Sequence, residues 1–176
     1  MGLSYETCAM LFEELAWADS GYADTFVTGF VAFRNILLAG TPAQARRFAD
    51  VLAPGAFAAF CLTEAGAGSD VAALRTTAVL DGDEYVINGT KSFITNGSIA
   101  SLYVVFAKTD PAAGARGITG FLVDGSAPGL SAGAKEHKMG FRLSDTCEVV
   151  FDNVRVPREA VIGEVGGGMA VALGAL

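Results

Sequence analysis

The stretch TTAVLDGDEYVINGTKSFITNG, residues 76–97, decides the fold class of this chain. It holds three β-prone runs separated by Asp81-Gly82 and Asn88-Gly89: Thr76–Leu80, Glu84–Ile87 and Lys91–Thr95. Asp-Gly and Asn-Gly are typical of two-residue hairpin loops, because such loops need backbone angles that these residues tolerate. The spacing therefore predicts an antiparallel meander that turns at both dipeptides.

Helices are expected before this stretch and further strands after it. Up to Pro54 the apolar residues recur every three or four positions, which predicts helices. Ser4 is the expected cap of the first helix and Gly21 its expected stop, whereas Thr41-Pro42 opens the third. The second helix, Tyr22–Leu38, is apolar nearly all round and is expected to be buried. The later strands are expected at Leu102–Lys108, Gly117–Val123, Leu130–Gly133 and Cys147–Phe151.

Helices followed by strands indicate the α+β class and not a parallel doubly wound sheet. We expect an antiparallel, β-barrel-like or sandwich domain over residues 54–160, preceded by a partial helical domain over residues 1–53. Three glycines then precede the apolar run Met169–Leu176, which predicts the opening turns of a C-terminal helical bundle over residues 161–176. That run reaches Leu176 without a stop signal, so the expectation is an internal fragment of a longer chain.

Composition excludes several classes of protein. The 176 residues carry a net charge of −7 with no basic cluster, which argues against a protein that binds nucleic acid by neutralising phosphates. No membrane span is expected, because Arg34 and Asn35 interrupt the longest apolar run. Cys8, Cys61 and Cys147 lie far apart, so neither a disulfide framework nor a metal site is expected. Residues 1–20 lack the pattern of a signal peptide, and a cytoplasmic location is expected.

The segment CLTEAGAGSD, residues 61–70, places glycines and hydroxyl groups at the end of an apolar strand. Successive backbone N–H groups around Gly66 and Gly68 can cradle a phosphate, although neither the dinucleotide-binding fingerprint nor a P-loop is present. The alternative is a plain glycine-rich loop in which Thr63 and Ser69 hydrogen-bond their own main chain. Pattern alone leaves both interpretations open.

A second candidate site follows in Phe93-Ile94-Thr95. These residues alternate along a strand, so Phe93 and Thr95 are expected on one face and Ile94 on the other. An aromatic ring beside a hydroxyl group can stack on a flat cofactor and hydrogen-bond its edge. The alternative places Phe93 in the core and pairs Thr95 with a turn.

The remaining candidates have simpler interpretations. Phe60, Cys61 and Leu62 are typical of buried strand residues. Glu64 and Asp70 could form an acid pair, although Asp70 is better interpreted as the cap of a turn. His137, the one histidine, has no nucleophile at a suitable spacing and is expected in an exposed loop.

Several motifs, in a fixed order, resemble the acyl-CoA dehydrogenase family. They are Cys61–Glu64 with Gly66–Asp70, Asn88–Lys91 with Phe93–Gly97, Lys135–Gly140, Ser144–Thr146, Val149–Phe151 and Val154–Pro157. The resemblance implies an N-terminal helical domain, a middle β domain and a C-terminal helical bundle, assembled as a homotetramer or dimer with FAD near the interfaces. It also implies oxidation of an acyl-CoA to the trans-2-enoyl-CoA, with electrons passed to an electron-transfer flavoprotein.

The same resemblance implies a flavin site. The backbone around Leu62 and Thr63 would bind the pyrimidine edge of the flavin, while Gly68 and Ser69 would face the pyrophosphate. Phe93 would lie against the isoalloxazine ring and Thr95 would hydrogen-bond near N5. The full set of implied cofactor-binding residues is Phe60, Cys61, Leu62, Thr63, Gly68, Ser69, Phe93, Ile94 and Thr95, and Ser69 is also the implied contact of the acyl-CoA.

The chain departs from the family in three respects. Ala65 stands where proline is common, and Phe93 replaces the tryptophan of some members. In the family, a glutamate of the C-terminal domain removes the α proton of the thioester while the β hydrogen leaves as hydride to the flavin. Both known placements of that glutamate fall beyond Leu176, and neither Glu159 nor Glu164 matches them. No catalytic residue is therefore assigned, and the chain alone is expected to be inactive.

Two alternatives stay open. One keeps the fold but changes the reaction, giving a flavin oxidase or monooxygenase in which reduced flavin meets oxygen. The other is a truncated, non-catalytic assembly subunit that retains the β domain only for its contacts with other chains.

Overall fold

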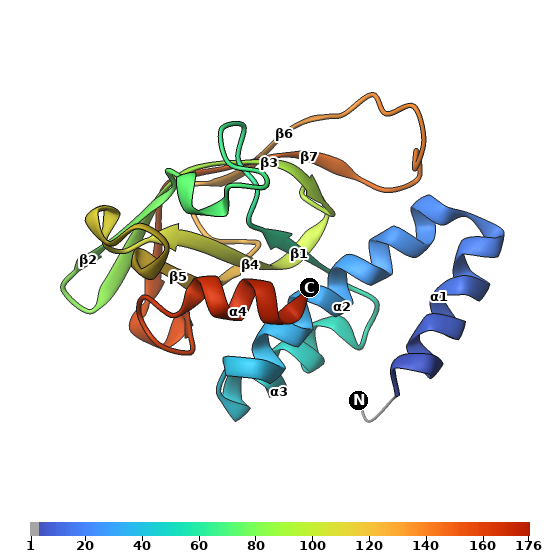
Figure 1. Ribbon diagram of the computed structural model, residues 1–176, viewed down its shortest axis with the longest axis horizontal. Coiled ribbons are helices and arrows are strands. Elements are labelled where there is room, and N and C mark those ends of the chain that lie inside the picture. Colours follow the sequence, from blue (N-terminus) through green and yellow to red (C-terminus); the bar gives the residue numbers. More distant parts are fainter. Residues whose placement is uncertain (1–3) are drawn as a thin grey trace.

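The computed structural model describes residues 4–176 and shows helices on one side of a sheet (Figure 1). Within these residues the helices are α1 (Tyr5–Ala18), α2 (Ser20–Ala39), α3 (Pro42–Leu52) and α4 (Gly168–Ala175). The strands are β1 (Phe57–Cys61), β2 (Thr77–Asp81), β3 (Glu84–Thr95), β4 (Ala100–Lys108), β5 (Ile118–Asp124), β6 (Leu130–Lys135), β7 (Thr146–Pro157) and β8 (Val161–Ile162). The predicted α+β class is confirmed.

The sheet is mixed and mostly antiparallel. Its strand order is β6-β7-β3-β2-β4-β5-β8, and β1 pairs with β4 off this path. β2 meets β4 in parallel at one residue pair, and β1 runs parallel to β4. The antiparallel pairing expected for this domain holds at all the other strand pairs. In the chain, the β2–β3 hairpin lies between β1 and β4. After this hairpin the chain follows β4 in the same direction as β1, and turn residues, which act locally, cannot reveal that direction.

The turn predicted at Asp81-Gly82 is confirmed, whereas the turn predicted at Asn88-Gly89 is wrong. Gly82 comes directly after β2 and has a φ of +64°, and β3 pairs antiparallel with β2. β3 then continues through Asn88 and Gly89 with a register shift against β7. Gly89 has φ +151°, and a Cβ there would collide with Thr76. The glycine therefore serves a bulge where two backbones approach closely.

Capping residues set the helix boundaries. The side chain of Ser4 caps α1 as expected, and Thr41 forms a capping box with Gln44 at the start of α3. The stop predicted at Gly21 is wrong, because α1 ends at Ala18 and Asp19 caps α2 by accepting from the Tyr22 N–H at 2.9 Å. An aspartate at the N-cap starts a new helix, and the glycine falls inside its first turn.

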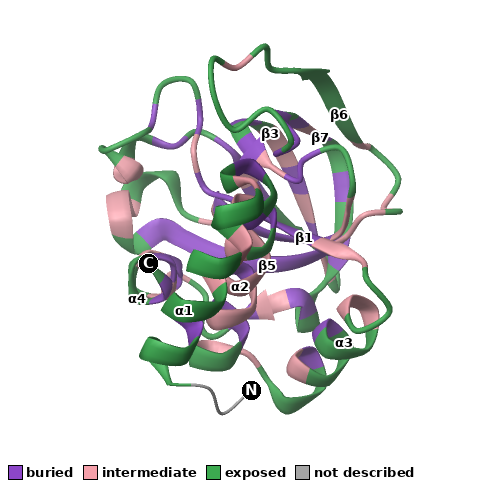
Figure 2. Ribbon diagram, turned by 90° about the vertical axis from the view of Figure 1, so that its right-hand side faces the viewer, coloured by how far each residue is buried: buried purple, intermediate pink, exposed green. Residues whose placement is uncertain are grey.

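The second helix is buried on one face only. Ala32 and Ile36 of α2 are buried, whereas four of its large apolar residues, Tyr22, Phe26, Leu37 and Leu38, are 39–56% exposed. The prediction of complete burial is therefore wrong within residues 4–176, because the sheet covers one side of the helix. Figure 2 shows the same division, with buried strands inside and exposed outer faces on the helices.

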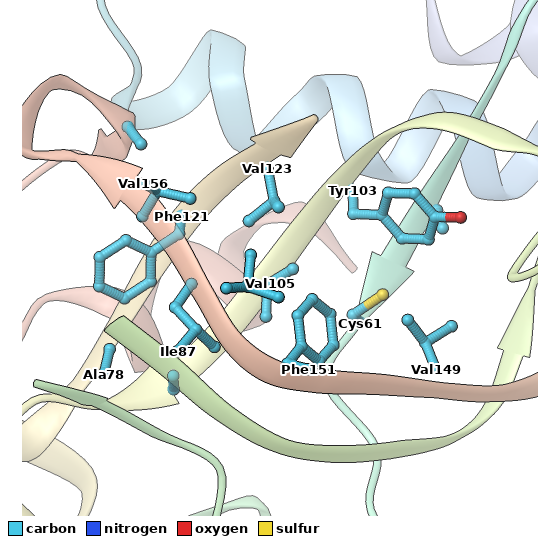
Figure 3. Close-up of a cluster of buried hydrophobic side chains, with 14 of the residues drawn as sticks. Cys61, Ala78, Ile87, Tyr103, Val105, Phe121, Val123, Val149, Phe151 and Val156 are labelled. Carbon is cyan, nitrogen blue, oxygen red and sulfur yellow. The ribbon is translucent and has the colours of Figure 1, made fainter. Parts of the chain in front are cut away.

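Two apolar clusters lie on opposite faces of β4. Tyr103, Val105 and Ala107 belong to the inner cluster, which Figure 3 shows among the strands. Leu102, Val104 and Phe106 belong to the helix-side cluster, which also contains Ala32 and Ile36 of α2, Phe48 of α3 and Ala172 of α4. The helices and the sheet thus share a core. No helix within residues 4–176 combines the length and apolar character needed to cross a bilayer.

Candidate functional site

The loop after β1, residues 62–70, lies against β3 (Figure 1). The Ser92 N–H donates to the Thr63 carbonyl at 2.9 Å, and the Lys91 ammonium group donates to the Leu62 carbonyl at 3.1 Å. These contacts bring together the two segments that the motifs single out, residues 62–70 and 93–95.

Much of the backbone in residues 62–70 is available to a ligand. No acceptor within residues 4–176 pairs with the N–H groups of Thr63, Gly68 and Ser69. Gly68 and Ser69 are exposed, and a Cβ placed on Gly66 or Gly68 would meet no atom within 4 Å. The packing of the fold does not itself require glycine at these positions, so their small size leaves room for an anionic group to approach the backbone.

Phe93 projects from the surface in an unusual backbone conformation. Its side chain is 65% exposed and its φ is +58°, in the left-handed region that aromatic residues rarely adopt. A register shift between Lys91 and Ile94 places the residue in a bulge of β3. The alternative that buries Phe93 in the core is therefore wrong. Backbone outliers of this kind cost about 1–3 kcal/mol and cluster at binding sites.

Thr95 is half-buried beside helix α2. Its hydroxyl group donates to Asp24 Oδ2 at 3.3 Å, and the Ser144 hydroxyl group donates to the same oxygen at 2.8 Å. The link to Thr95 is long and leaves that hydroxyl weakly held. Sequence reasoning missed Asp24, because an isolated acid on an apolar helix gives no sign of the strand and loop that meet it.

Other residues of the implied site point into the interior. Cys61 and Ile94 lie in the inner cluster, and Figure 3 shows the Cys61 thiol near Phe151 and Val149. Burial raises the pKa of this thiol, which keeps it neutral. Leu62 is buried in the helix-side cluster, and Phe60 is half-buried against Phe106. Cys61, Leu62 and Ile94 can therefore offer a ligand mainly their backbone.

A buried ion pair lies beneath this loop. Lys91 Nζ is 2.8 Å from Glu64 Oε1, and the two residues are 0% and 8% exposed. Glu64 also accepts from the N–H groups of Arg75 and Thr76, at 2.6 and 3.0 Å. Burial alone would raise the pKa of the Glu64 carboxyl, but the hydrogen bonds and charge of Lys91 and the bonds from residues 75–76 outweigh it, so the pKa is lowered.

The structure confirms the interpretation of His137 and contradicts that of Asp70. His137 lies in an exposed loop, as predicted. The cap predicted for Asp70 is wrong, since its side chain is exposed and caps nothing, and Glu64 pairs with Lys91 and not with Asp70. Sequence reasoning missed Lys91, because a lysine between Thr90 and Ser92 is typical of an exposed strand position. Among residues 4–176 no group of His, Cys, Asp and Glu side chains is arranged to hold a metal ion.

Known proteins are similar to this chain in sequence and in fold. The family model for the acyl-CoA dehydrogenase middle domain matches residues 59–154. The mitochondrial short/branched chain specific acyl-CoA dehydrogenase of Rattus norvegicus is 42% identical over 174 residues, which cover 98% of this chain and 40% of that protein.

Two solved structures superpose closely. Butyryl-CoA dehydrogenase from Megasphaera elsdenii gives a TM-score of 0.90 at 42% identity, covering 93% of this chain and 44% of its own. An acyl-CoA dehydrogenase from Bacillus anthracis, complexed with FAD, gives 0.90 at 34% identity, covering 99% of this chain and 30% of its own. The chain thus spans less than half the length of each of these proteins. From the matched middle domain and these relatives, the chain belongs to the acyl-CoA dehydrogenase family.

Proposed function

We propose that this chain forms the flavin-binding part of an FAD-dependent acyl-CoA dehydrogenase. The whole protein would oxidise a saturated acyl-CoA to the trans-2-enoyl-CoA, pass the electrons to an electron-transfer flavoprotein, and assemble as a homo-oligomer. The observation that carries this proposal is the meeting of residues 62–70, with their unpaired N–H groups, and residues 93–95, with an exposed ring and a hydroxyl group. A solved relative complexed with FAD supports the choice of cofactor.

Both segments would contribute to FAD binding. The Thr63 N–H would donate to the pyrimidine edge of the flavin, and the N–H groups of Gly68 and Ser69 would face the pyrophosphate. The exposed ring of Phe93 would lie against the isoalloxazine, and the Thr95 hydroxyl group would donate near N5. FAD supplies the hydride acceptor when it is bound. Donors fixed along that edge stabilise the negative charge that reduction brings.

Ser69 would also contact the acyl-CoA, because its hydroxyl group is exposed at the end of the same loop. No residue of this chain is proposed as the base that removes the α proton. Glu159 and Glu164 are exposed, and neither side chain is hydrogen-bonded to residues 62–70 or 93–95. The chain by itself is therefore expected to bind FAD but not to reduce a dye when an acyl-CoA is added.

Titration of the flavin-free chain with FAD, followed by flavin fluorescence and the visible spectrum, tests this proposal. The wild-type chain should bind FAD. Thr95→Val should weaken the affinity about 2- to 10-fold, the effect of one neutral hydrogen bond of about 0.5–1.5 kcal/mol. Thr90→Val is the matched control, since Thr90 is an exposed threonine on the same strand outside the proposed contacts, and it should bind like wild type. A wild-type chain that leaves FAD free, or equal losses in the two variants, would overturn the proposal.

A further inference from the structure

We propose that Lys91 is a positioning residue of the flavin site, acting through the Leu62–Thr63 peptide and not by contact with the cofactor. The inference rests on the proposed function and adds a residue outside the implied set of cofactor-binding residues. Its basis is the buried ion pair of Lys91 with Glu64 and the hydrogen bond from Lys91 to the Leu62 carbonyl.

Lys91 carries its charge inside the protein. Lys91 is fully buried, and lysine is almost never found so without a partner. Burying two charges carries a desolvation penalty on the order of several kcal/mol per ion, and apolar residues of similar size often serve stability as well or better. Stability of the fold alone therefore does not explain a lysine at this position, and a role for its hydrogen bonds does.

Lys91 sets the direction of the Leu62–Thr63 peptide group. No cis peptide bond occurs within residues 4–176, so the Leu62 carbonyl and the Thr63 N–H point in opposite directions. The carbonyl is aimed at the buried Lys91 Nζ, 3.1 Å away, which turns the N–H away from the ammonium group. A bond from a charged donor also polarises the peptide and makes its N–H a stronger donor. Lys91 thus presents a strengthened donor where the flavin edge is proposed to bind.

The same ion pair also holds the rest of the loop. The Glu64 carboxylate accepts hydrogen bonds from the Lys91 ammonium group and from the N–H groups of residues 75 and 76. This one carboxylate therefore links the two ends of segment 64–76. Ser92, next to Lys91, holds the Thr63 carbonyl. The ion pair therefore ties both ends of the segment that carries Gly68 and Ser69 to the strand that carries Phe93. Burial lowers the pKa of Lys91, and the hydrogen bond and charge of Glu64 raise it part of the way back. The pair is therefore sensitive to the loss of either partner.

The test compares the binding of oxidised and reduced FAD by the whole 176-residue chain. Lys91→Met should weaken reduced FAD about tenfold more than oxidised FAD, because the strengthened donor acts where negative charge appears on reduction. That ratio corresponds to a midpoint potential lowered by about 30 mV for a two-electron couple. Glu64→Gln combined with Lys91→Met removes both charges, which lets the protein fold if the single variant does not, and it should show the same shift.

Val154→Ala is the matched control. It removes buried apolar atoms from β7 in the inner cluster, at a position paired with Ile87 and not with Lys91, so it should lower stability and leave the affinity ratio unchanged. An unchanged ratio in both lysine variants, or an equal shift in Val154→Ala, would overturn the role of Lys91 alone. A wild-type chain that binds neither form of FAD would overturn the proposed function and this inference together.

Discussion

At the scale of single residues, Phe93 combines a large side chain with a backbone conformation that such a side chain disfavours. Its φ of +58° is one that glycine adopts without strain and other residues adopt at a cost of about 1–2 kcal/mol. We predict that Phe93→Gly will be more stable than Phe93→Ala by about 1 kcal/mol, because alanine keeps the strained backbone after the ring is lost. This order reverses the usual one, in which glycine within a strand is less stable than alanine by roughly 0.5–1 kcal/mol. Urea unfolding of the flavin-free chain measures the difference.

Thr90 provides the control for this prediction. It is exposed on the same strand and has no positive φ, so Thr90→Ala should be more stable than Thr90→Gly. The same order at both positions would contradict the strain assigned to Phe93. Both Phe93 variants should also bind FAD more weakly than wild type, since both lack the ring that is proposed to lie against the flavin.

At the scale of elements, hydrogen bonds and an ion pair of Asp145 hold the β6–β7 connection against the sheet. Its carboxylate accepts from the Ser98 N–H at 2.8 Å and the Ser98 hydroxyl group at 2.9 Å, and it pairs with Lys135. Burial alone would raise the pKa of this carboxyl, but the Ser98 bonds and Lys135 outweigh it and lower the pKa. A folded-state pKa below the unfolded value of about 4 means that the stabilisation is present above that pH and is lost as the pH falls through the folded value.

We therefore predict that Asp145→Asn will lower the free energy of unfolding at pH 7 by about 1–3 kcal/mol, because its partners are left incompletely bonded. As the pH falls below about 4 and through the lowered pKa of the folded state, the variant and the wild type should progressively converge. Urea unfolding over a series of pH values measures both effects. Asp50→Asn, at an exposed position on α3 without an ion pair, should match wild type throughout. Parallel curves for Asp145→Asn and wild type down to the lowest pH would contradict the prediction.

The same elements show how far the sequence predicts the structure. Helix starts at Ser4 and Thr41 and the turn at Asp81-Gly82 follow from capping and turn residues, which act over a few positions. Asn88-Gly89 has the same local preferences, but pairing with the distant strand β7 makes it a bulge. The parallel pairing of β1 with β4 likewise depends on what the chain does between them.

The candidate site, too, was predicted from the sequence only in part. The segments around Thr63 and Phe93 were found from their motifs, since glycines, hydroxyl groups and an aromatic ring are visible in the sequence. Asp24 and the Glu64–Lys91 pair were missed, because a charged residue shows its burial and its partner only after the chain has folded.

At the scale of the whole molecule, the helix-side cluster joins the helices and the sheet in one apolar core. Ile36 of α2 is 1% exposed and shares this cluster with Val104 and Phe106 of β4. We predict that Ile36→Ala will lower the free energy of unfolding by about 2–5 kcal/mol, the usual effect of deleting buried methyl groups. If the chain unfolds as one unit, the slowest-exchanging amides of α2 and of β4 should lose equal protection in native-state hydrogen exchange.

Leu37 tests whether that loss comes from the shared core. It is the next residue on the same helix but is 53% exposed, so Leu37→Ala changes helix propensity little and deletes few core contacts. Its effect on both sets of amides should stay below about 1 kcal/mol. Loss of protection confined to α2 in Ile36→Ala, with β4 unchanged, would mean that the helices open without the sheet.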